Sequence, residues 1–81
     1  MKYICIRNGC IDEIVLFADF IAHKDMAESL KSRGAPISAG FARQDLEGEW
    51  ECAGCSDSLG LESRERDTGL LRMMMKNPIC L

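Results

Sequence analysis

The sequence predicts an α+β fold, in which an antiparallel sheet of four to five strands carries two helices packed on one face. Residues 2–17 and 37–55 hold short runs rich in β-branched and aromatic residues, as strands do. Apolar residues recur at helical spacing in residues 17–31 and 63–77. The predicted order is strand, strand, helix, strand, strand, an optional short strand and helix. Two hairpins that are each followed by a helix are typical of a layered α+β domain.

The first two strands are expected to form a hairpin. Asn8-Gly9 lies between two runs rich in Ile, Val, Tyr and Phe, and both turn residues tolerate a positive φ angle. We favour a bulged turn that pairs Ile6 with Cys10 over a two-residue turn that pairs Ile6 with Ile11. The bulged register places four apolar side chains on one face: Ile4, Ile6, Ile14 and Leu16.

Residues 17–31 predict the first helix, with Asp19 as its N-cap. Its apolar face is formed by Phe20, His23, Met26, Ala27 and Leu30. Ser63 is the predicted N-cap of the last helix, which runs to about residue 77 and ends before Pro78. The charged residues near its start, Arg64 and Asp67 among them, are expected to be solvated.

Residues 37–43 alternate between larger apolar residues and the small residues Ser38, Gly40 and Ala42. This alternation predicts a strand, and its small face suggests that another part of the protein approaches closely there. Residues 49–55 predict the next strand, with Gly54 at a bulge or at the strand end. Residues 59–61 predict a short edge strand.

Length and charge limit the class of protein. The 81 residues suffice for one compact domain, spanning residues 1–81. Ten basic against thirteen acidic residues give a net charge of -3, which disfavours a nucleic-acid binder. The longest apolar run, residues 14–18, is too short to cross a membrane. Arg7 interrupts the first apolar stretch and the five cysteines are odd in number, so we expect a cytoplasmic protein with reduced thiols.

Cys52 and Cys55 form a C-x-x-C pair, which allows two alternative interpretations. A zinc-stabilised module needs further ligands, for which the candidates are Cys5, Cys10, Cys80 and His23. A thiol redox protein needs a lowered cysteine pKa, as at a helix N-terminus, whereas this pair lies in a predicted strand. We therefore expect no metal or cofactor, with zinc as the alternative. His23 is expected to be a partly buried histidine with one hydrogen-bond partner.

The last helix carries the strongest functional signal. Its apolar residues cover roughly 200° of the helix surface, whereas a helix that covers a sheet needs an apolar stripe of about 100°. Methionine side chains adapt to many partners, so Leu71, Met74 and Met75 are the candidate interaction surface. The sequence contains no phosphate-binding loop and no nucleophile elbow. It therefore predicts a non-enzymatic module that binds a protein partner or a second copy of itself, with a homodimer expected, and binds neither nucleic acid nor membrane.

Overall fold

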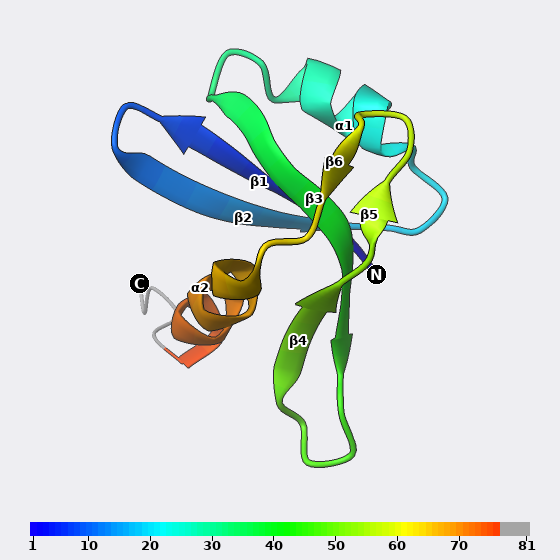
Figure 1. The fold of residues 1–81 in the computed structure, drawn as a ribbon, viewed down its shortest axis with the longest axis vertical. Coiled ribbons are helices and arrows are strands. Elements are labelled where there is room, and N and C mark those ends of the chain that lie inside the picture. Colours follow the sequence, from blue (N-terminus) through cyan, green and yellow to red (C-terminus); the bar gives the residue numbers. More distant parts are fainter. Residues whose placement is uncertain (77–81) are drawn as a thin grey trace.

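Strand β1 (Lys2–Asn8) lies inside the main sheet, and its residues from Tyr3 to Ile6 are buried. It pairs with β2 (Ile11–Phe17) on one side and with β3 (Ala35–Gln44) on the other. The second half of β3 pairs with β4 (Trp50–Ala53). All pairs are antiparallel and the strand order is β2-β1-β3-β4, as Figure 1 shows. The predicted α+β class and the antiparallel sheet are confirmed.

The remaining elements are two short strands and two helices. β5 (Cys55–Ser56) and β6 (Leu61–Glu62) form a separate two-stranded sheet, so the predicted short strand does not join the main sheet. The helices are α1 (His23–Ser29) and α2 (Glu65–Lys76). This computed structural model describes residues 1–76. Neither helix in that part of the chain is long and apolar enough to cross a membrane.

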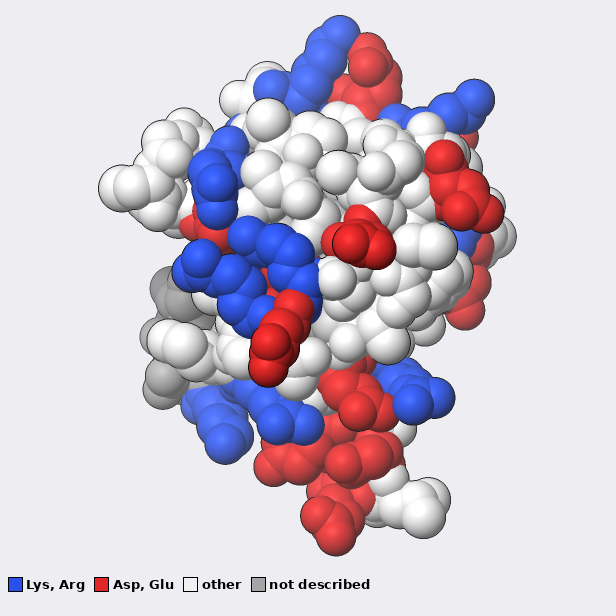
Figure 2. Space-filling view, viewed as in Figure 1, with Lys and Arg blue, Asp and Glu red and all other residues white. Residues whose placement is uncertain are grey.

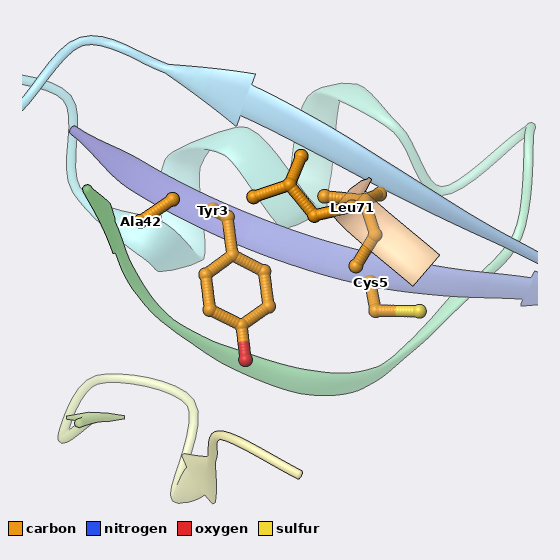
Figure 3. Close-up of a cluster of buried hydrophobic side chains, with 5 residues drawn as sticks. Tyr3, Cys5, Ala42 and Leu71 are labelled. Carbon is orange, nitrogen blue, oxygen red and sulfur yellow. The ribbon is translucent and has the colours of Figure 1, made fainter. Parts of the chain in front are cut away.

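The two helices pack on opposite faces of the main sheet, which corrects the prediction that both cover one face. Tyr3 and Cys5 share a buried cluster with Leu71 of α2 (Figure 3). Ile4 and Ile6 belong to a second cluster, formed with the α1 side of the sheet. Successive side chains of a strand point to opposite faces. Because β1 is apolar at four successive positions, each face of the sheet needs its own cover.

The β1–β2 turn is centred one residue later than predicted. Asn8 pairs with Ile11, which leaves Gly9 and Cys10 as the two turn residues, and Ile6 pairs with Glu13. Both predicted registers are therefore wrong. Gly9 has a φ of 65° and Cys10 does not have a positive φ, which fits a type II′ turn with glycine at its first central position. In this register the side chains of Ile14 and Leu16 join the α2 face, opposite Ile4 and Ile6.

Helix α1 is shorter than the predicted helix at residues 17–31. Phe17 remains in β2, where it pairs with Lys2, so pairing along the whole hairpin displaces the helical pattern at this end. Residues 18–21 form a turn in which the N–H of Ile21 donates to the carbonyl of Ala18 at 3.1 Å. Asp19 is not the N-cap. Ala22 occupies that position without a side-chain cap, and Asp19 instead lies 3.2 Å from the N-terminal amine.

The small face of β3 serves the close approach that the sequence predicts. A Cβ atom placed on Gly40 would lie 2.5 Å from the carbonyl oxygen of Ala53, which is far inside van der Waals contact. Ser38 and Ala42 are fully buried on the same strand. Gly54 has a φ of 85° and follows directly after β4, so it marks the predicted strand end.

Candidate interaction surface

The predicted surface residues of α2 do not lie together. Leu71 is 0% exposed and belongs to the core, so its assignment to an interaction surface is wrong. Met74 and Met75 are both exposed, and the neighbouring Met73, which the prediction left out, is the most exposed of the three. Met75 lines a hollow beside Trp50, whereas Met74 faces the β1–β2 hairpin. The wide apolar arc of α2 therefore divides into a core side and two separate exposed sides.

Met74 and Ile11 are exposed apolar residues that line the same hollow at the hairpin end of β2, among polar residues that include Asp12, Glu13 and Arg33. Both line one hollow together with Ile6, although Ile11 and Met74 are far apart in the sequence. Ile11 is 69% exposed and Met74 is 41% exposed. We call Ile11 and Met74 the hairpin-end surface. The sequence does not identify Ile11 as exposed, because the first hydrophobic residue of a strand after a turn can point either to the core or to solvent.

A second group of exposed apolar side chains lies at the other end of β2. Phe20 follows the strand and is 90% exposed. The contact between Asp19 and the N-terminal amine holds this segment beside Met1. Phe41 is also exposed, but it lies on β3, which β1 separates from β2, and its ring meets that of His23 edge to face. We call Met1 and Phe20 the Phe20 surface.

The outer edge of β4 is closed by α2. The N–H of Cys52 donates to Thr68 Oγ1 at 3.0 Å. Arg72 Nε donates to the carbonyl oxygen of Trp50 at 2.7 Å. Trp50 and Cys52 stand on either side of Glu51, which pairs with Arg43 of β3. Because backbone groups alternate in direction along a strand, those of Trp50 and Cys52 point away from β3. A helix that satisfies an edge strand in this way prevents that strand from pairing with another chain.

The outer edge of β2 has no such partner. In a two-residue hairpin the residues that flank the turn form a hydrogen-bonded pair, here Asn8 and Ile11. Alternation along the strand then turns the backbone groups of Asp12, Ile14 and Leu16 away from β1. Residues 1–76 provide no hydrogen-bond partner for these outward groups. β2 is therefore an edge of the main sheet that is open along its full length within the described chain.

Both carboxylates on β2 are compensated by arginines. Arg7 Nε donates to Asp12 at 2.7 Å, and this hydrogen bond holds the pKa of Asp12 below its ordinary value. Arg33 Nη2 donates to Glu13 at 2.6 Å. Figure 2 shows a separate acidic group at the β3–β4 turn and basic side chains gathered over the start of α2. The open edge thus carries little unbalanced charge of its own.

A buried polar cluster joins the start of α2 to β1. Asp67 is 0% exposed and accepts a hydrogen bond from the Tyr3 hydroxyl at 2.6 Å. The backbone N–H of Arg64 donates to the same carboxylate at 3.0 Å, and its guanidinium donates at 2.8 Å. Ser63 Oγ lies 2.8 Å from the Tyr3 hydroxyl. The expectation that Arg64 and Asp67 are solvated is wrong for Asp67.

The buried Ser38 hydroxyl lies at the margin of this cluster. It is close enough to Asp67 and Cys5 to help lower the pKa of both groups. It makes no hydrogen bond of good geometry within the described residues. Burial nonetheless raises the pKa of the Cys5 thiol, which suits a packing residue rather than a reactive one.

The residues proposed for zinc do not meet at one site, because Cys5 and Cys52 pack in the same cluster on the α2 side whereas His23 lies in α1. His23 Nε2 is 2.9 Å from the carbonyl oxygen of Gly40 and its ring meets Phe17 edge to face, so it is a buried histidine with one polar partner, as expected. Cys52 is half-buried on the α2 side and Cys55 is exposed. No three His, Cys, Asp or Glu side chains of residues 1–76 are placed to hold a metal ion, and Cys80 lies outside these residues.

The C-x-x-C pair also lacks the electrostatic features of a redox pair. Burial raises the pKa of Cys52 to about 11, whereas a reactive thiol needs a lowered pKa. Gly54 separates the two cysteines with a positive φ, and they belong to different sheets. Thr68, near the start of α2, lies close enough to the Cys52 thiol to lower its pKa, but burial outweighs this effect.

Comparison with known proteins identifies no family for this chain. No protein-family model, curated protein or solved structure matches it. The features of this chain that could bind a partner are the hairpin-end surface, the Phe20 surface and the open edge of β2.

Proposed function

We propose that this protein is a small non-enzymatic interaction module that acts as a homodimer and uses the hairpin-end surface. The observation that carries the proposal is the shared hollow of Ile11 and Met74. A single exposed apolar residue is ordinary on a protein surface. Exposed apolar residues that converge on one hollow from separate elements are typical of an interaction site.

The size of the chain supports a partner of the same kind. A chain of 81 residues buries roughly 60% of the surface that its unfolded form exposes, so its core is small. Small domains commonly gain stability by association. Methionine suits such a surface, because its flexible and polarisable side chain packs against varied shapes.

The polar groups of the interior support a binding role over a catalytic one. Asp67 is closed to solvent and its oxygens are taken up by Tyr3 and Arg64. A catalytic group must reach a substrate, so this cluster is better suited to holding α2 against the sheet. His23 is likewise buried and partnered.

Native mass spectrometry of the purified protein tests the proposal. The wild type is expected to be a dimer, and the double variant Ile11→Ser/Met74→Ser a monomer with an unchanged circular dichroism spectrum. Both side chains are exposed, so their loss should leave the core intact. Leu71 is unsuitable for this test because its replacement would create a core cavity.

The matched control is Leu46→Ser, which removes a fully exposed apolar side chain from the β3–β4 turn. This variant should remain a dimer. A monomeric wild type would refute the homodimer, and a double variant that stays dimeric would refute the hairpin-end surface as its interface.

A further inference from the structure

We infer that two copies join by pairing their β2 strands antiparallel about a twofold axis at Ile14, so that the main sheet continues from one copy into the other. This inference rests on the homodimer proposed above and assigns its geometry. It adds a backbone interface to the exposed side chains that the hairpin-end surface provides.

The two edges of the main sheet differ in a way that selects β2. At β4 the outward N–H of Cys52 and the outward carbonyl of Trp50 are bound by Thr68 and Arg72 of α2. At β2 the outward groups of Asp12, Ile14 and Leu16 find no partner among residues 1–76. An unpaired edge offers a template for a further strand, and its backbone hydrogen bonds supply affinity.

The sequence of β2 favours an axis at Ile14. Ile14 is the middle residue of this seven-residue strand, so an axis there pairs every strand residue with another strand residue. Glu13 then lies opposite Val15 of the partner subunit. An axis at Glu13 would place two like charges directly opposite each other, which is destabilising. An axis at Val15 would leave Ile11 beyond the end of the partner's strand.

Charge does not oppose this pairing. Asp12 and Glu13 are the acidic residues of β2, and each is already bonded to an arginine of its own chain. The acidic group at the β3–β4 turn lies at the far end of the molecule from the hairpin tip (Figures 1 and 2). Charged side chains commonly protect edge strands from pairing with another strand. Here the arginines of the same chain neutralise the two carboxylates, so this protection is weak.

The two exposed apolar surfaces point to a second copy of this chain as the occupant. The hairpin-end surface lies at the start of β2, and the Phe20 surface lies at its end. Antiparallel pairing brings the end of the partner's β2 to the start of β2. The partner's Phe20 then approaches Ile11, and the same contact recurs across the axis. A twofold interface of this kind is self-complementary.

Disulfide cross-linking tests the register. Glu13 and the partner's Val15 would form a non-hydrogen-bonded pair, whose Cα atoms lie about 4.5 Å apart and within reach of a disulfide. Glu13→Cys and Val15→Cys are prepared separately, each with the exposed Cys10 and Cys55 replaced by serine. They are mixed, allowed to exchange and oxidised with diamide. Identical positions lie about 7–8 Å apart on the diagonal, which disfavours cross-links within either variant alone.

The expected result is that the mixture forms at least about fivefold more covalent dimer than either variant alone, because the pair distance favours one combination. If native mass spectrometry shows a dimer but the mixture has no excess, β2 pairing is overturned and the homodimer stands. If the wild type is monomeric, both proposals fall and the open edge is left to a strand of a different protein.

A second measurement does not depend on engineered cysteines. Phe20→Ser removes an exposed side chain that the fold does not need. It should weaken the dimer by about tenfold or more, as expected for the loss of a buried phenylalanine at an interface. Leu46→Ser should leave the dissociation constant unchanged. Equal constants for both variants would remove Phe20 from the interface and contradict this geometry.

Discussion

At the scale of single residues, Asp67 is the side chain on which the position of α2 depends. Burial raises the pKa of its carboxyl group, but hydrogen bonds from Tyr3 and Arg64 outweigh burial and hold the pKa below its ordinary value. Asp67 therefore stays ionised while it is shielded from water. It links β1 to the start of α2 across 64 positions of the sequence.

Asp67→Asn should destabilise the fold by about 3 kcal/mol near pH 7, because it removes one partner of a buried ion pair. The pH dependence has a definite sign. Asp67 contributes its full stability above the unfolded pKa of about 3.9, and this contribution is lost as pH falls through the lower folded pKa. Denaturant unfolding between pH 2 and pH 7 should show a flatter acid branch for the variant.

The exposed Asp25 provides the control for this measurement. Asp25→Asn should change the free energy of unfolding by no more than about 0.5 kcal/mol and keep the acid branch. An Asp67→Asn variant that is as stable as Asp25→Asn, with the same acid branch, would contradict the anchoring role.

The sequence indicates few of the residues in this cluster. Asp67 stands among charged neighbours at the start of a helix, where solvation is the ordinary expectation. Its burial depends on Tyr3, which only the folded chain brings near. The opposite case is His23, whose position on an apolar helix face predicts a partly buried histidine with one hydrogen-bond partner. The structure provides that one partner and buries the side chain almost completely.

At the scale of elements, the close packing of β3 against the chain after β4 depends on Gly40. Gly40→Ala would place a Cβ atom 2.5 Å from the Ala53 carbonyl oxygen, and that oxygen is backbone, so the strand itself must shift. Overpacking of this kind costs typically about 1–3 kcal/mol. Thermal unfolding followed by circular dichroism should show a lower melting temperature for the variant.

Gly69 is the matched control, because it lies on the exposed side of α2 and an added methyl group there would meet open space. Gly69→Ala should stabilise the protein by about 0.5–1 kcal/mol through helix propensity alone. The same substitution thus has opposite signs at two positions. Equal effects at both would show that the contact at Gly40 is unimportant.

The sequence predicts most elements but not all of their limits. Strand β3 and the last helix are found because their patterns persist over many residues. The first helix is predicted too long, since the helical spacing of residues 17–31 overlaps a strand that continues to Phe17. The hairpin turn moves by one residue because Gly9 can take the first central position of a type II′ turn.

At the scale of the whole molecule, the arrangement of the helices follows from one feature of β1. Its four successive apolar residues, from Tyr3 to Ile6, leave no polar face, so a helix is needed on each side. The apolar run of β1 is visible in the sequence. The repeated order of two strands and a helix nevertheless predicts that both helices cover one face of the sheet. With one helix on each face, α2 lies beside β4 and the edge at β2 remains open.

The sequence indicates the proposed interaction surface only in part, for the same reason. The excess apolar arc of α2 is real, but which of its residues are exposed depends on the face that meets the sheet. Leu71 turns to the core, while Met74 joins Ile11 from a strand far away in the sequence. Helical spacing within α2 cannot identify a residue contributed by another element.

The proposed homodimer makes a prediction about the whole molecule that can be tested first on the wild type. Binding that favours the native state stabilises it by mass action, so a dimer unfolds at a higher temperature as the protein concentration rises. Calorimetry from micromolar to hundreds of micromolar protein should show this rise for the wild type. The double variant Ile11→Ser/Met74→Ser should show a melting temperature independent of concentration.

The comparison separates association from intrinsic stability. If Ile11 and Met74 act only at the interface, wild type and double variant should converge at low concentration, where the wild type also dissociates. Parallel curves that never converge would mean that the two side chains stabilise the single subunit. Convergence would instead indicate a subunit whose small core is sufficient to fold but whose exposed apolar end is covered only when a second copy is present.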